Sequence, residues 1–130
     1  MTLHSPSCPE GMQCNSDEVL LRYLIENEIG LVCTDEEQIK LAIRLGSTPD
    51  RIIFSNPIKP SHHVNYARCI GINTLVFDNE DELENIREHH FDSDLLLRIE
   101  VEESDHISRR FGAHVDRCDK LLELCIDWGL

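Results

Sequence analysis

The six cysteines are the first residues whose type could support chemistry, because thiolates bind zinc and form disulfides. They stand at positions 8, 14, 33, 69, 118 and 125. No two of them form a C-x-x-C pair, the short spacing that is typical of zinc sites. Those at 33, 69, 118 and 125 lie inside apolar patterns, where a reduced thiol packs as a small hydrophobic group. The cysteines are therefore predicted to be reduced and structural.

Two adjacent pairs, His62-His63 and His89-His90, stand out among the seven histidines. Side chains next to each other on a helix diverge, whereas helical side chains that meet are spaced i, i+3 or i+4. We therefore expect both pairs to lie on solvated helix faces, and the sequence predicts no metal site.

Charge excludes two classes of partner. The chain has 25 acidic and 12 basic residues, a formal net charge of −13, which repels nucleic-acid phosphates and anionic lipid headgroups. The N-terminal MTLHSPSCPEG has neither the basic nor the apolar region of a signal peptide. No apolar run approaches the ~18 residues of a membrane span. We expect a cytoplasmic protein that binds neither nucleic acid nor membrane.

Length and composition fit one domain. With 130 residues, 41% of them hydrophobic, the chain can bury one modest core. We assign residues 1–10 to a disordered N-terminal segment and residues 11–130 to the domain.

Helix signals recur along this domain. Ser16 is predicted to cap a helix over residues 17–25, and Thr34-Asp35-Glu36-Glu37 has the T-x-x-E pattern of a capping box. Further helices are predicted to start at Ser61, after Asn79 and near Asp116. The predicted buried positions of these helices are Ile39, Ala42, Ile43, Val64, Ala67, Ile70, Leu83, Ile86, Leu121, Leu122 and Cys125.

Short apolar strands separate the helices. They begin near Leu31, Ile52, Thr74 and Leu95, a period of about 21 residues that fits one strand, one helix and two loops. Continuous apolar strands indicate a parallel sheet covered on both faces, either an open doubly wound sheet or an arc of a barrel. Four to five βα units are about half of the ~250 residues of a closed barrel. We therefore expect a truncated barrel or a sheet with edges to cover.

Several motifs follow one another in a fixed order. They are Gln13-Cys14-Asn15, I-x-x-x-N-P-x-K at 52–59, F-D-x-E-x-E-L at 77–83, L-R-I at 97–99 and F-G at 111–112. Together they resemble the N-terminal barrel of the ornithine decarboxylases and their antizyme-inhibitor relatives. The resemblance implies an α/β fold, a partial TIM-type (alanine-racemase-like) barrel of four to five βα units.

The family's enzymes carry pyridoxal phosphate as a Schiff base on a lysine in an A-V-K-C-N segment. Gln13 takes that lysine's position, and an amide nitrogen cannot add to an aldehyde. Val32 and Gln38 stand where the family has an aspartate and a glutamate of the cofactor site. Arg98 alone matches a cofactor-site residue, and we favour a structural ion-pair role for it. No catalytic residue and no bound cofactor are therefore expected.

The resemblance also implies partners. The family's antizyme-binding element, which is basic, falls on residues 61–84, where Arg68 is the one basic residue (Lys or Arg) against five acidic ones. Charge reversal of this kind opposes antizyme binding. We instead expect self-association or pairing with a decarboxylase-family subunit.

The expected function is that of a truncated, inactive relative of ornithine decarboxylase, regulatory or vestigial, linked to polyamine (putrescine) biosynthesis. Three alternatives remain open: a pyridoxal-phosphate-dependent ornithine decarboxylase, an antizyme-binding inhibitor-like protein, and an unrelated α/β binding module.

Overall fold

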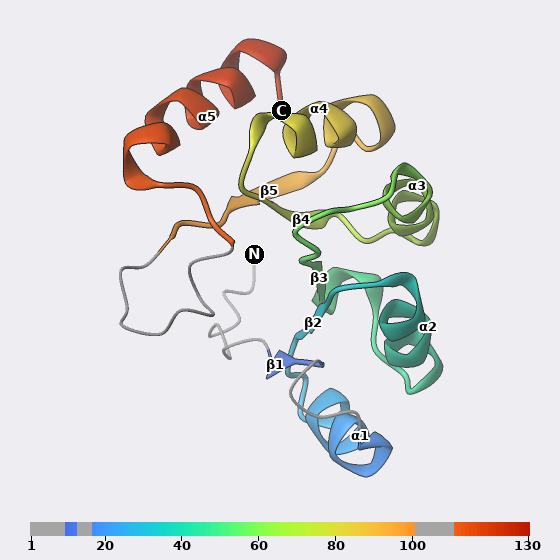
Figure 1. Ribbon diagram of the computed structural model, residues 1–130. Coiled ribbons are helices and arrows are strands. Elements are labelled where there is room, and N and C mark those ends of the chain that lie inside the picture. Colours follow the sequence, from blue (N-terminus) through green and yellow to red (C-terminus); the bar gives the residue numbers. More distant parts are fainter. Residues whose placement is uncertain (1–9, 13–16, 101–110) are drawn as a thin grey trace, which may run out of the picture.

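The computed structural model describes residues 10–12, 17–100 and 111–130. Strands and helices alternate along these residues (Figure 1). The strands are β1 (Glu10–Gly11), β2 (Leu31–Cys33), β3 (Ile52–Phe54), β4 (Thr74–Phe77) and β5 (Asp94–Leu97). The helices are α1 (Glu18–Glu26), α2 (Glu36–Arg44), the 3₁₀ helix η1 (Pro49–Arg51), α3 (Ser61–Ile70), α4 (Glu80–His89) and α5 (Val115–Trp128).

The strands form one parallel sheet in the order β1-β2-β3-β4-β5. Leu31 pairs with Ile52, and Leu75 pairs with Leu95, so equivalent positions of successive units lie side by side. The sheet bends into an arc with the helices along its outer side (Figure 1). The predicted α/β fold, an arc of βα units of the TIM-barrel type, is confirmed. Strand β1 was not predicted, and it begins one residue before the predicted domain boundary.

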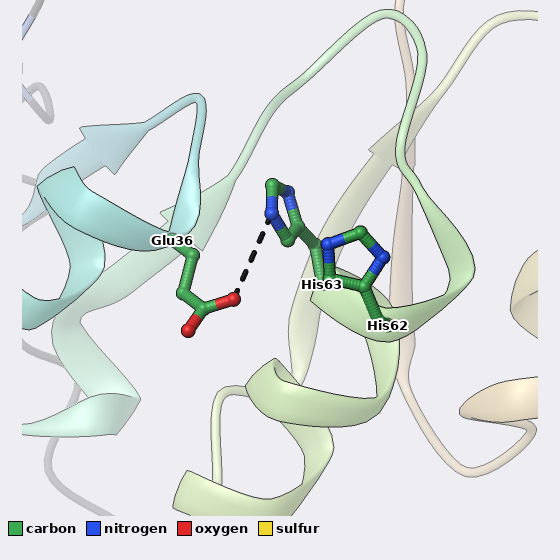
Figure 2. A group of neighbouring side chains, drawn as sticks. All are labelled: Glu36, His62 and His63. Carbon is green, nitrogen blue, oxygen red and sulfur yellow. Dashed lines mark ion pairs between the residues drawn. The ribbon is translucent and has the colours of Figure 1, made fainter.

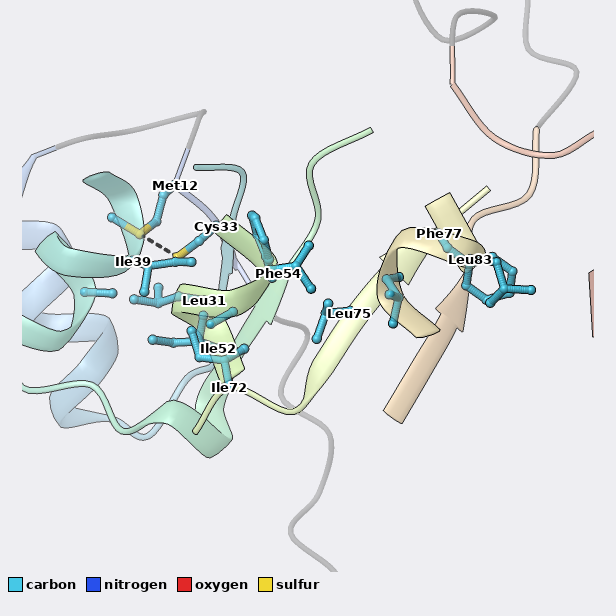
Figure 3. Close-up of a cluster of buried hydrophobic side chains, with 14 of the residues drawn as sticks. Met12, Leu31, Cys33, Ile39, Ile52, Phe54, Ile72, Leu75, Phe77 and Leu83 are labelled. Atoms are coloured by element: carbon cyan, nitrogen blue, oxygen red, sulfur yellow. Dashed lines mark hydrogen bonds between the residues drawn. The ribbon is translucent and has the colours of Figure 1, made fainter. Parts of the chain in front are cut away.

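The core lies between the sheet and the helices. Alternate strand residues point to this layer and are fully buried, with helix residues such as Ile39 and Leu83 packed on them (Figure 3). The strand residues are Leu31, Cys33, Ile52, Phe54, Leu75 and Phe77. The opposite face is half-buried at Val32 and Ile53, and Leu96 is exposed there. The described residues therefore cover this second face only in part, as expected of an arc that is not a closed barrel.

Two predicted helix caps are shifted by one residue. Asp17, not Ser16, caps α1, because its carboxylate accepts the Val19 N–H at 2.8 Å. Asp35, not Thr34, caps α2 by accepting the Gln38 N–H at 2.8 Å. Asp is as good an N-cap as Ser or Thr, so residue type alone does not decide between adjacent candidates.

Other helix signals are confirmed. Asn79 caps α4, accepting the Glu82 N–H at 2.9 Å, and Gly71 ends α3 with a left-handed backbone. Ile43, Leu122 and Cys69 are exposed, however, and were predicted to be buried. Each of the three belongs to the apolar pattern of its helix, but it lies outside the part of the helix surface that is buried. Among the described helices, none is both long enough and apolar enough to cross a membrane.

Candidate functional site at the carboxyl ends of the strands

A cavity of about 270 Å³ opens at the carboxyl ends of the parallel strands. This end of a βα barrel sheet is where ligands bind, because the loops that follow the strands converge there. The cavity is lined by Gly11, Val32, Thr34, Ser55, Pro57, Arg98 and Phe111. The residues lie in, or within three residues after, strands β1, β2, β3 and β5, except Phe111.

Arg98 supplies the one charged side chain among these seven lining residues. Its Nη2 donates to the Ser55 hydroxyl at 2.7 Å. Its backbone N–H donates to Phe77 at 2.8 Å, and its carbonyl accepts the Ala113 N–H at 2.8 Å. Its guanidinium is thus bonded to a hydroxyl, and the predicted ion-pair role stays a prediction. An arginine held at both backbone and side chain can present its remaining N–H groups to an anion.

Three residues, Gln13, Val32 and Gln38, differ from the family's cofactor-site residues, and the structure places one of them in the cavity. Val32 lines it as an apolar wall. Gln38 is used locally instead: its Oε1 accepts the Thr34 N–H at 2.9 Å and the Thr34 hydroxyl at 3.2 Å. Gln13 lies outside the described residues. The cavity thus collects Val32 and Arg98 but not Gln38.

The lining residues do not fit covalently held pyridoxal phosphate. A Schiff base needs an amine, and the cofactor's ring nitrogen needs a carboxylate to act as an electron sink. The seven lining residues include neither a lysine nor a carboxylate. The chain's three lysines are Lys40, Lys59 and Lys120. None of the three lines this cavity.

Lys59 is buried, which is rare for a lysine unless it is paired. Its side chain is 0% exposed, and Nζ lies 2.6 Å from Glu82 Oε2. Nζ also donates to the carbonyls of Asn56, at 2.7 Å, and Val76, while the Lys59 N–H donates to Glu82 Oε1 at 2.9 Å. Burial lowers the pKa of Lys59 and raises that of Glu82, and each partner's charge opposes the shift of the other. The pair locks the loop after β3 onto α4.

The histidine pairs differ from expectation. His90 is 1% exposed rather than solvated, and its Nε2 lies 2.7 Å from the Ile72 carbonyl. His62 and His63 do not diverge: their ring centroids are 4.3 Å apart, beside Glu36 of α2. No sequence signal paired Glu36 with these histidines, because the α2–α3 contact is tertiary.

Comparison with known proteins identifies similar chains. The family profile "Pyridoxal-dependent decarboxylase, pyridoxal binding domain" matches residues 11–128. Ornithine decarboxylase of Schizosaccharomyces pombe is 39% identical over 116 residues, covering 87% of this chain and 27% of the relative. Antizyme inhibitor 2 of Xenopus laevis is 34% identical, covering 87% of this chain and 25% of the relative.

Solved structures agree with this fold. The arginine decarboxylase of Paramecium bursaria Chlorella virus superposes with a TM-score of 0.89 at 29% identity, covering 94% of this chain and 34% of that one. Ornithine decarboxylase from Entamoeba histolytica gives 0.83 at 28% identity, covering 94% and 33%. The chain spans about a quarter to a third of the length of these relatives.

Proposed function

Because this chain belongs to the family of pyridoxal-dependent decarboxylases, we propose that it serves polyamine biosynthesis by binding a protein partner and not by decarboxylation. One observation carries the proposal: among the described residues, those that line the cavity at the strand ends include neither an amine nor a carboxylate. The relatives that support the polyamine connection are ornithine decarboxylases and an antizyme inhibitor. We place this role in the cytosol, where thiols such as Cys33 and Cys69 stay reduced.

Two groups that the decarboxylation chemistry requires are replaced in this chain. A decarboxylase of this class needs a nucleophilic amine and an ionised group at the cofactor ring. Gln13 and Val32 stand at two of these family positions. Catalytic groups act as a unit, so the loss of several is not compensated by one that remains, such as Arg98.

The acidic residues of segment 61–84 were the reason for doubting antizyme as the partner, and the contacts of these residues weaken that reason. Of the five acidic residues in 61–84, Glu82 is buried against Lys59, and Asp78 Oδ2 accepts the Gly112 N–H at 3.0 Å. Glu80 is paired with Lys120 at 2.6 Å. Glu84 lies 3.8 Å from Arg87, so four of the five charges are partnered within the chain. This supports antizyme as a second candidate partner beside a decarboxylase-family subunit.

The first experiment asks whether chemistry remains. The purified chain is incubated with pyridoxal phosphate and ornithine, carbon dioxide is measured, and borohydride trapping is followed by peptide mass mapping. We expect no stoichiometric adduct and no carbon dioxide above a no-protein blank. Gln13→Lys is expected to stay inactive, because it restores one group of several. A single adduct at one lysine together with ornithine turnover contradicts the proposal.

The second experiment asks what is bound. Immobilised chain is exposed separately to an active ornithine decarboxylase and to antizyme. Asp81→Lys/Glu84→Lys adds positive charge to the 61–84 surface and is expected to strengthen antizyme binding. Glu123→Lys, an exposed change on α5, is the matched control and leaves binding unchanged. Binding to neither protein overturns the proposed role.

A further inference from the structure

Three potential metal ligands meet where α2 and α3 begin. Glu36 is the first residue of α2, and His62 and His63 are the second and third of α3. One donor atom from each lies within 4.8 Å of the others (Figure 2). We propose that Glu36, His62 and His63 form a binding site for a divalent transition-metal ion, with zinc as the ion that fits the donors best. This inference does not rest on the proposed function.

The geometry is close to what the ion requires. Glu36 Oε2 lies 3.6 Å from His63 Nε2. Zinc bonds of about 2.0–2.2 Å in a tetrahedral arrangement hold ligand atoms roughly 3.4 Å apart. The Glu36–His63 edge therefore needs little adjustment. His62 is exposed and can rotate its ring toward the same point.

The two ring nitrogens of His63 differ in their surroundings: Nε2 faces the Glu36 carboxylate, and Nδ1 lies on the buried side. Its Nδ1 is buried and has no hydrogen-bond partner among the described residues. The buried His90 provides the contrast, because both of its ring nitrogens have partners: the Ile72 carbonyl at 2.7 Å and Asp92 at 3.3 Å. Both ring nitrogens of His90 are used within the fold, whereas Nε2 of His63 faces the Glu36 carboxylate and is the nitrogen that would bind the ion.

Lys40 orients the carboxylate. Its Nζ lies 2.8 Å from Glu36 Oε1, which leaves Oε2 facing His63. Outer partners of this kind fix the orientation of metal ligands. The ammonium and the two helix N-termini repel a cation, so binding depends on both imidazoles as well as the carboxylate.

The donor set determines the class of ion. Two imidazole nitrogens and one carboxylate oxygen suit zinc, nickel and copper, whereas calcium and magnesium prefer oxygen ligands alone. Three protein ligands leave a fourth position for water, as in open zinc sites. Because the ligands come from two helices, the ion would join α2 to α3 and stabilise the folded chain by mass action.

Calorimetric titration of the metal-stripped full chain with Zn²⁺ tests the site. We expect one ion per chain, and an affinity at least roughly 10-fold lower in His62→Gln and in His63→Gln, the minimum loss seen when zinc sites lose even an outer partner. Glu36→Gln, which can still accept from Lys40, is expected to lose affinity similarly. His89→Gln, a change outside the cluster, is the matched control and keeps the affinity. Circular dichroism verifies that each variant is folded.

Co²⁺ as a spectroscopic probe separates this site from thiol binding, since the chain has six cysteines. We expect ligand-field bands without thiolate charge transfer, and their loss in the double variant His62→Gln/His63→Gln. A thiolate charge-transfer band, or unchanged Zn²⁺ binding by the folded double variant, places the ion elsewhere and overturns the proposal. Absence of any binding by the original chain also overturns it.

Discussion

Cys33 and Cys69 are residues of one type whose reactivity should differ because of their positions in the fold. Cys33 is fully buried at the end of β2, where its Sγ lies 3.3 Å from the Met12 sulfur. Burial, together with the charge of Asp35, raises the pKa of Cys33 to about 12. Cys69 is exposed on α3. Only the thiolate is an effective nucleophile, so Cys33 is protected both by its burial and by its raised pKa, whereas Cys69 is accessible.

Alkylation measures this difference. With iodoacetamide at about pH 8, near the ordinary thiol pKa, Cys69 should be modified and Cys33 protected, because its raised pKa keeps the thiol protonated there. Peptide mass spectrometry reports both sites, and modification of Cys33 in urea is the positive control. Equal rates at the two sites without denaturant would contradict the buried position of Cys33.

The Lys59–Glu82 pair gives a second prediction at the residue scale. Glu82→Gln removes one charge and leaves the buried Lys59 uncompensated, which costs about 3 kcal/mol of the free energy of unfolding. The double variant Lys59→Met/Glu82→Leu should recover part of that loss, since it removes both charges from the interior. Urea denaturation measures both, with the exposed Glu84→Gln as control. A loss no greater than that of the control would show that the pair is not buried in solution.

At the scale of elements, some short connections require a glycine, because no other residue fits the backbone angles and contacts there. Gly112 lies next to the segment after β5, because its neighbour Ala113 forms a parallel β-bridge with Ile99. Its φ is +111°, and a Cβ there would lie 2.6 Å from the Glu100 nitrogen. The neighbouring atoms are backbone and cannot move aside without disturbing the segment that holds Arg98. Gly112 is therefore required twice, by its φ and by this contact.

Gly112→Ala tests both requirements against a matched glycine. Gly46 has a similar φ of +106°, but a Cβ there would meet nothing within 4 Å. We expect Gly46→Ala to lower the free energy of unfolding by about 1 kcal/mol from backbone strain alone, and Gly112→Ala by about 3 kcal/mol or more. Chemical denaturation compares the two. Equal losses would mean that the Glu100 contact relaxes freely.

At the scale of the whole molecule, the sheet buries one face under its helices and leaves apolar groups on the other. Leu96 is 45% exposed on that second face, and Ile99 and Phe111 beyond β5 are also exposed. Large exposed apolar side chains on a sheet face that helices do not cover favour association. We therefore predict that the chain self-associates through this face.

Sedimentation at low and high protein concentration measures that association. Leu96→Glu should shift the chain toward monomer without loss of stability, because a charge disfavours burial in an interface. Leu122→Glu, 48% exposed on α5, is the matched control and should leave association unchanged. A monomer at all concentrations, or an equal effect of the two variants, would refute this surface.

The sequence by itself determined strands β2 to β5, the helices between them and their order, but not strand β1. Apolar runs near Leu31, Ile52, Thr74 and Leu95 predict strands β2 to β5, because strand and helix periods are local properties of the chain. Asn79 and Gly71 mark helix ends for the same reason. Of the candidate site, the sequence identified Val32 and Arg98, through the resemblance of motifs to a family.

Only the tertiary structure decided which side chains meet. Lys59 finds Glu82, 23 positions away, and is buried in spite of its type. His63 of α3 lies beside Glu36 of α2. Leu122 is exposed although it belongs to an apolar pattern. A pattern records the preferences of one element, whereas burial depends on whether a second element covers it. Contacts between distant segments therefore required the folded chain.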